Sequence, residues 1–153
     1  MVRVVRWIGI GLVVLAAVFA AITLSGGSSA AACGVGVERG VLPEWARTGF
    51  SEKEPRIAHV IGRNGELAAI LFADPLVAPA RPDGPTNKIL WVAKRTPPPG
   101  PLRLTAEQDG RTEERSVENG PGPSGVDLPA GCWHVKARWP GGEDELDLTY
   151  VAR

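Results

Sequence analysis

The sequence is poor in the residues from which metal centres are built. Its 153 residues include two histidines, two cysteines and a single methionine, Met1. A zinc site needs three or four His, Cys or carboxylate ligands at convergent spacing. The two histidines, His59 and His134, lie far apart in the sequence, and no methionine that could bind copper follows Met1. We therefore predict no metal site and no cofactor.

An excess of charge of one sign is also missing. The 17 Lys and Arg residues are balanced by 17 Asp and Glu residues, so the formal net charge is +0. Loss of Arg3 and Arg6 with an N-terminal signal would leave a small acidic excess. Nucleic-acid binding needs a basic face that neutralises phosphates, so we expect no nucleic-acid partner.

Motifs of covalent catalysis are absent as well. The segment Gly122-Pro123-Ser124-Gly125 lacks the Gly-x-Ser-x-Gly spacing of a nucleophile elbow. The glycines between Gly34 and Gly40 lack the spacing and the βαβ surroundings of a dinucleotide fingerprint. The sequence therefore predicts a protein that is not an enzyme. The alternative is a small cell-envelope hydrolase or metal-dependent enzyme whose site assembles from distant loops, with the candidate side chains His59, Asp74, Ser124 and His134.

Apolar side chains are plentiful at the start of the chain. Residues 7–24 carry no charge and follow Arg3 and Arg6. An apolar run behind a basic start is typical of an export signal, and its arginines stay on the cytoplasmic side. As a helix the run would be about 27 Å long, close to the thickness of a bilayer core. We predict that residues 1–32 are a signal peptide or membrane anchor, and that the rest is extracytoplasmic, attached to the bacterial cell membrane or secreted.

Cys33 follows directly after three alanines and admits two interpretations. Small residues before a cysteine resemble a bacterial lipobox, in which the cysteine is acylated, although Ala30 stands where a lipobox usually has leucine. Outside the cytoplasm, however, an even number of cysteines indicates a disulfide, here between Cys33 and Cys132. The two interpretations exclude each other because the acyl chain and the disulfide need the same sulfur.

The exported part is predicted to be a tether followed by one β-domain. Residues 33–56 are mostly irregular, with Pro43 and Gly49 placed to begin and end a short helical turn. Residues 57–153 alternate apolar runs with Gly/Pro turns, and they include hairpin signals at Asn64-Gly65 and Asp109-Gly110. This pattern predicts strands over residues 57–61, 66–72, 88–94, 102–107, 111–117, 132–139 and 145–150, with loops over 78–87 and 119–125.

About seven or eight short strands without a long amphipathic helix predict an all-β fold. We expect an immunoglobulin-like β-sandwich, preceded by an N-terminal signal or transmembrane helix. In the last hairpin, Lys136 and Arg138 should lie across from Glu145 and Asp147. The acidic cluster near its turn, formed by Glu143, Asp144, Glu145 and Asp147, is expected to be a solvated tip. The tryptophans of the domain are expected in its core, and the weak candidates for ligand contact are His59, Trp91 and His134.

Three blocks of the exported part resemble one group of proteins. They are residues 42–50 (LPEWARTGF), residues 87–92 (NKILWV), and residues 120–129 (GPGPSGVDLP) with Gly131-Cys132-Trp133. They are similar to blocks in uncharacterised exported proteins of actinobacteria, many of which look like lipoproteins. The resemblance implies an exported single β-domain with a lipid anchor, and it favours lipidation of Cys33 over the disulfide.

These features together predict a membrane-tethered or secreted β-sandwich module that binds rather than catalyses. Its expected partners are the membrane, through the N-terminal segment or a lipid, and an envelope protein or wall polymer. A purely structural role, in which the domain braces a membrane complex, is a further hypothesis.

Overall fold

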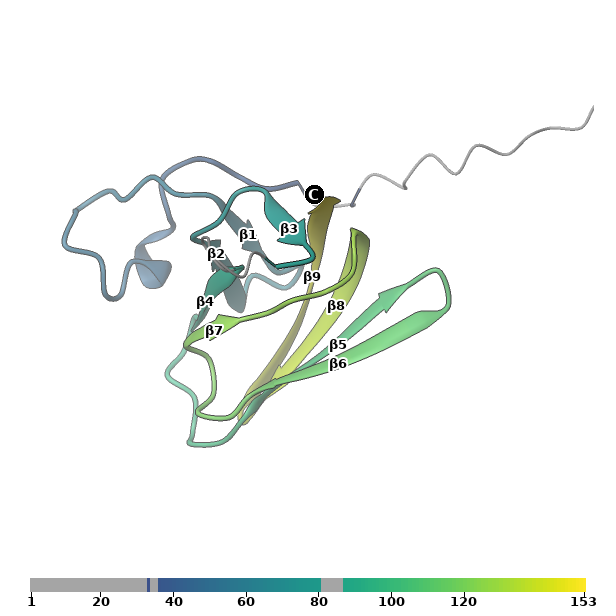
Figure 1. Ribbon diagram of the computed structural model, residues 1–153. Coiled ribbons are helices and arrows are strands. Elements are labelled where there is room, and N and C mark those ends of the chain that lie inside the picture. Colours follow the sequence, from purple (N-terminus) through teal and green to yellow (C-terminus); the bar gives the residue numbers. More distant parts are fainter. Residues whose placement is uncertain (1–32, 34–35, 81–86) are drawn as a thin grey trace, which may run out of the picture.

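The computed structural model describes residue 33, residues 36–80 and residues 87–153, and within them the chain is an all-β sandwich. Two sheets face each other and enclose the core (Figure 1). The all-β prediction is confirmed. The predicted signal or transmembrane helix lies in residues 1–32, outside the described residues. In the described ranges no helix is long and apolar enough to cross a bilayer.

Each sheet combines strands that are distant in the sequence. The four-stranded sheet has the order β1 (His59–Ile61), β2 (Leu67–Leu71), β4 (Lys88–Ala93) and β7 (Pro123–Gly125). The five-stranded sheet has the order β3 (Leu76–Ala78), β9 (Gly142–Ala152), β8 (Gly131–Trp139), β5 (Leu102–Gln108) and β6 (Arg111–Val117). Neighbouring strands are antiparallel, except that β3 runs parallel to β9.

The two hairpins predicted from Asn64-Gly65 and Asp109-Gly110 form at these residues. Strands β1 and β2 pair antiparallel across the Asn64-Gly65 turn, with His59 opposite Ile70. Between β5 and β6, Asp109 and Gly110 have φ angles of 46° and 77°. Positive φ at both central residues gives the type of tight turn whose twist matches that of the strands. Local turn chemistry therefore fixes these two registers.

Two strands lie at least partly in segments that were predicted to be loops. Strand β3 ends at Ala78, and β7 is built from a proline, a serine and a glycine. Proline and glycine have little strand propensity of their own, and β3 is only three residues long. Both segments become strands because a preformed neighbour offers pairing: Ser124 lies opposite Ile89 of β4, and Val77 opposite Val151 of β9. A proline is tolerated at this sheet edge, where no partner needs its missing N–H.

The central strand β2 is buried on both faces. Leu67, Ala69 and Leu71 belong to the core between the sheets, while Ala68 and Ile70 point the other way and are still fully buried. A strand covered on both faces has a continuous apolar sequence, as LAAIL does. Something must therefore cover the outer face of the four-stranded sheet.

That cover is the segment predicted to be a tether. Residues 36–56 lie beside β1 and β2, on the side away from the five-stranded sheet (Figure 1). Glu38 exchanges two backbone hydrogen bonds with His59, at 2.8 and 2.9 Å. Leu42, just before the 3-10 turn η1 (Glu44–Ala46), and Ala46 at its end are fully buried. Trp45, which was expected in the core, is half-buried. The segment is thus a folded strap rather than a free tether.

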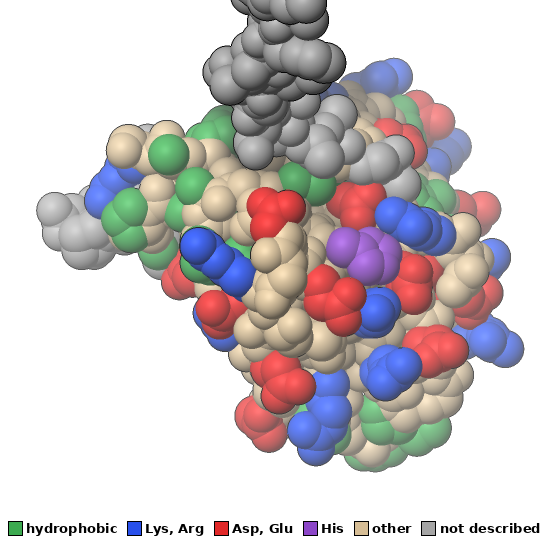
Figure 2. Space-filling model, turned by 90° about the vertical axis from the view of Figure 1, so that its right-hand side faces the viewer, with side chains coloured by type: hydrophobic (Ala, Val, Ile, Leu, Met, Phe, Trp, Pro, Cys, Tyr) green, Lys and Arg blue, Asp and Glu red, His purple; other side chains and the backbone are tan. Residues whose placement is uncertain are grey.

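The outer face of the five-stranded sheet is polar and charged. On β8 and β9, alternate residues face outward and form rows of acidic and basic side chains. Figure 2 looks onto this side of the molecule, where carboxylates and basic groups surround a histidine. Because opposite charges stand across from one another, the face carries little net charge.

Cys33, which precedes the strap, is covalently bound to that outer face. Cys33 and Cys132 form a disulfide with a Cα–Cα distance of 5.5 Å. Cys132 is near the beginning of β8 and lies opposite Thr149 of β9, on the outward side. The resemblance favoured lipidation of Cys33, with the disulfide to Cys132 as the alternative, and the structure has the disulfide. A sulfur in this bond cannot also hold an acyl chain.

We expect the disulfide to be a major source of stability. It closes a loop with a sequence separation of 99, and in the chain-entropy model such a loop contributes about 4.7 kcal/mol. Reduction, or the double variant Cys33→Ser/Cys132→Ser, should lower the free energy of unfolding by that order in urea titrations followed by tryptophan fluorescence. The reductant should have no effect on the double variant. A loss below about 1 kcal/mol on reduction would contradict the assignment.

Candidate functional site

A polar hollow in the described part of the molecule lies beside a buried carboxylate, that of Asp144. Along β9, residues 146, 148 and 150 face the core, and Asp144 continues this row, so its side chain also points inward. Asp144 is only 1% exposed. One carboxylate oxygen accepts hydrogen bonds from the backbone N–H groups of Asn64 and Glu145, each at 2.8 Å. The other accepts from Glu66 and Leu67, at 2.8 and 3.0 Å.

A glycine makes this arrangement possible. A Cβ atom on Gly62 would collide with the carboxylate of Asp144, so any larger residue there would displace it. The backbone N–H of Arg63 also donates to the carbonyl of Glu145 at 2.8 Å. The β1–β2 turn is thereby bound to β9 of the opposite sheet. For Asp144 the prediction of a solvated acidic tip is wrong, because the carboxylate replaces water as the partner of four amides.

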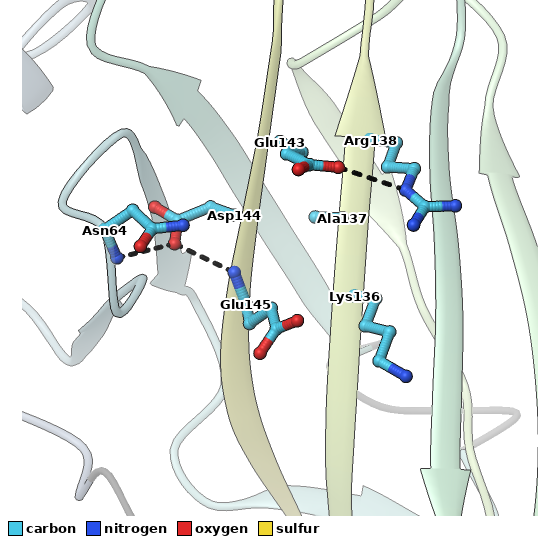
Figure 3. Close-up of a pocket in the computed structure, with 7 residues that line it drawn as sticks. All are labelled: Asn64, Lys136, Ala137, Arg138, Glu143, Asp144 and Glu145. Carbon is cyan, nitrogen blue, oxygen red and sulfur yellow. Dashed lines mark hydrogen bonds and ion pairs between the residues drawn. The ribbon is translucent and has the colours of Figure 1, made fainter.

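The hollow beside Asp144 is small. It has a volume of about 90 Å³ and is lined by Asn64, Lys136, Ala137, Arg138, Glu143, Asp144 and Glu145 (Figure 3). Sites for drug-sized ligands usually measure at least about 300 Å³. Arg138 already pairs with Glu143 at 3.2 Å. The space therefore suits a few water molecules, and the carboxylate at its wall acts as a structural group.

We expect Asp144→Ala to be strongly destabilising. The change leaves four amides without their acceptor, three of them partly buried and that of Leu67 fully buried, at a cost of roughly 3 kcal/mol. Glu143→Gln on the same strand is the matched control, because its side chain is exposed and its ion pair contributes at most about 1 kcal/mol. Urea unfolding at neutral pH measures both variants. Equal effects would show that the buried carboxylate has no special role.

A second polar cluster lies on the outer face of β8 and β9. His134 is placed between two carboxylates, with Nδ1 2.9 Å from Asp147 and Nε2 3.3 Å from Glu145. Arg63, from the β1–β2 turn, reaches the other oxygen of Asp147 at 3.2 Å. Asp147 is 4% exposed, so the expectation of a solvated tip is wrong for this residue too.

The pKa of Asp147 reflects two opposing effects. Burial penalises its charged form and by itself raises the pKa, but hydrogen bonds and charges from His134 and Arg63 outweigh burial. The net result is a pKa below the ordinary value of 3.8. Asp147 therefore stays ionised at neutral pH and binds the β1–β2 turn to the five-stranded sheet.

The register of the last hairpin agrees in part with the predicted charge pairs. Lys136 lies opposite Glu145, as expected, but Arg138 lies opposite Glu143, and His134 takes the place across from Asp147. Lys136 does not bind its cross-strand partner. Its ammonium group instead lies 3.1 Å from Glu107 of β5. Charge pairs thus connect three adjacent strands of this face.

We predict that Asp147 makes stability fall in acid. Because its folded-state pKa is depressed, its contribution is present above the unfolded pKa, and it is lost as the pH falls through the folded value. Free energies of unfolding between about pH 6 and pH 2 should therefore drop less steeply for Asp147→Asn than for the wild type. Glu145→Gln is the control, since its half-buried carboxylate binds only His134. An unchanged acid slope in Asp147→Asn would contradict the prediction.

The residues proposed for ligand contact or catalysis do not converge on one site, although Trp91 contacts Ser124. His59 is 1% exposed and its Nδ1 lies 2.8 Å from the carbonyl of Ile57. Trp91 is in the core and donates to the hydroxyl of Ser124 at 3.0 Å. Asp74 binds Arg39. Among the described residues, His59, Asp74, Ser124 and His134 do not form hydrogen bonds with each other, so the structure does not unite them in one constellation.

No other cluster of side chains in the described part of the chain forms a candidate metal site. No three His, Cys, Asp or Glu side chains there lie so that they could hold one metal ion. Two wider depressions exist. One, of about 410 Å³, lies around Arg39, Arg56 and the half-exposed Phe72. The other, of about 600 Å³, is lined by alanine, proline, Asp127 and Leu128.

Sequence reasoning missed two buried polar residues that organise the fold. Asn87 holds β3 by donating to the carbonyl of Val77 at 2.7 Å and accepting from its N–H at 2.9 Å. No pattern in the sequence marks this contact, because it joins a loop end to a short edge strand. Asp144 did carry a signal: the period-two alternation of β9 places it on the same face as Leu146 and Leu148.

Comparisons of the chain with protein-family models, with curated proteins and with solved structures found no match.

Proposed function

We propose that this chain is an extracytoplasmic, non-enzymatic binding module, held at the bacterial cell membrane or secreted. The observation that carries the proposal is the disulfide between Cys33 and Cys132. Disulfides persist in oxidising surroundings outside the cytoplasm and are rare within it. Cys33, the first of the two cysteines, comes nine residues after Leu24, where the apolar run ends. A disulfide so soon after the run supports an export function for that run.

The topology favours an immunoglobulin-like sandwich, a fold widely used for recognition. In that fold strands C′, C, F and G form one sheet and strands A, B and E belong to the other. The sheet β6-β5-β8-β9 matches the first set in order, and β2-β4-β7 matches the second. Strands β4 and β8 carry Trp91 and Trp133 in the core, where antibody domains have a disulfide between strands B and F.

The distance between the domain and the membrane follows from the length of the segment that connects them. Residues 25–32 connect the apolar run to the disulfide and can span at most about 28 Å. An uncleaved anchor would hold the domain that close to the bilayer, whereas cleavage after Ala32 would release it. Lipidation of Cys33 is the competing means of attachment, and the exported proteins that the chain resembles are its support. An envelope protein or a wall polymer is the proposed partner.

Intact mass of the protein from its native membrane and culture medium tests the proposal. We expect a chain without acyl mass that gains two hydrogens on reduction. A chain beginning at Cys33 with acyl mass would contradict the disulfide, though it would keep the protein outside the cytoplasm.

Labelling of intact cells with a membrane-impermeant maleimide tests location separately. The cysteines should react only after an impermeant reductant has opened the disulfide. A Ser116→Cys variant, whose thiol lies on the exposed strand β6, is the positive control. Labelling that requires cell lysis would overturn the extracytoplasmic assignment.

A further inference from the structure

Three connections meet at one end of the sandwich. They are residues 94–101 between β4 and β5, residues 118–122 between β6 and β7, and residues 140–141 between β8 and β9. Their contact is close: a Cβ on Gly120 would lie 2.9 Å from the carbonyl oxygen of Gly100, and one on Gly100 would lie 2.6 Å from the ring of Pro140. We call this end the tip. Its loops brace one another through glycines that leave no room for side chains.

The tip is remote from the point where the chain enters the domain. Strand β8 begins beside the disulfide at Cys132 and ends at the tip with Trp139. Seven residues of extended strand cover about 23 Å. A domain held by its N-terminus would therefore present the tip away from the membrane.

The longest of the three loops contains a rigid extended segment. In Thr96-Pro97-Pro98-Pro99, each proline fixes its own φ near −65°, and each residue before a proline is restricted to extended conformations. The described cis bonds are Asp74–Pro75 and Ala78–Pro79, so the three bonds to the prolines of this segment are trans. Over residues 96–98 these restrictions favour a polyproline II conformation before any partner protein binds.

One side of this segment is packed and the other is free. A Cβ on Gly141 would lie 3.2 Å from Pro98, so the β8–β9 turn supports the segment from beneath. Pro98 and Pro99 are nevertheless exposed, as are Lys94 and Arg95 just before them. Arg95 touches Glu66 at 3.2 Å but its side chain is 78% exposed. The tip thus displays proline rings next to two basic groups.

We propose that the tip is a docking surface for a partner protein whose groove is lined by aromatic side chains and edged by carboxylates. The proposal rests on the proposed function, of which it names the surface and the partner class. Aromatic grooves bind polyproline II segments because proline rings pack on flat side chains and the rigid backbone loses little entropy. Lys94 and Arg95 select the acidic rim and orient the partner along the segment.

Site-specific photo-crosslinking in the native membrane tests this. The photoreactive residue p-benzoylphenylalanine replaces Thr96 at the tip, and in a matched control it replaces Thr112, an exposed threonine of β6. We expect a protein adduct at position 96 and at least tenfold less at position 112. Mass spectrometry should place the crosslink on a peptide that contains Trp or Tyr together with Asp or Glu.

Competition and substitution make the test specific. A synthetic peptide of residues 94–101 should suppress the adduct, and the same peptide with alanine at positions 97–99 should not. Pro98→Ala/Pro99→Ala should reduce the adduct at position 96 about tenfold, whereas Pro129→Ala, an exposed proline at the opposite end, should leave it unchanged. Unaltered near-ultraviolet circular dichroism would show that the variants remain folded.

Several outcomes would overturn the inference. They are no adduct at position 96, equal adducts at both positions, an adduct with a wall polymer instead of a protein, or an adduct that survives the peptide. None of these would disturb the proposed function, which the disulfide mass and the cell-surface labelling test independently. If intact cells showed no surface labelling, the proposed function would be wrong, and the proposal of an extracytoplasmic docking partner would be wrong with it.

Discussion

The carboxylate of Asp144 is the contact on which the arrangement of the two sheets depends. It lies at the core edge of β9 yet accepts its hydrogen bonds from three amides of the β1–β2 turn and one from its own strand. A charge so deeply buried is tolerated only when several donors compensate for lost hydration. Arg63 and Asp147 add a second link between the same two elements on the outer face. Together they hold the hairpin of one sheet against the longest strand of the other.

Much of the fold could be predicted because local patterns decide it. Alternation placed Trp133, Val135 and Ala137 in the core, and Asp109-Gly110 fixed the β5–β6 turn. Strand β7 could not be predicted, since a serine and a glycine pair only when β4 is already in place. Strand β3 could not be predicted because it has three residues and pairs with β9, which is distant in the sequence. The strap was missed for a similar reason: Leu42 and Ala46 look unremarkable until the outer face of β2 needs a cover.

The candidate sites were harder to predict than the strands. His59 and His134 stood out by type alone, yet the first lies beside Glu38 of the strap and the second belongs to an ion-pair network. Their roles depend on neighbours such as Glu38 and Asp147, which come from other parts of the chain. The polyproline segment is different, because covalent restrictions dictate its shape before any tertiary contact forms. Its place at the tip, however, follows only from the topology.

The parallel pairing of β3 with β9 bears on how such domains behave when crowded together. Strand β3 covers the edge of the longest strand, and Glu38 of the strap covers β1. Strand β3 is itself a sheet edge, but the side chain of Asn87 binds the N–H and the carbonyl of Val77 there. In the described part of the chain, the other open edges are β6 and β7. The first carries the charged sequence RTEERSV and the second contains a proline, and both features discourage strand addition by another molecule. Copies concentrated in two dimensions on a membrane would therefore resist fusing into continuous sheets.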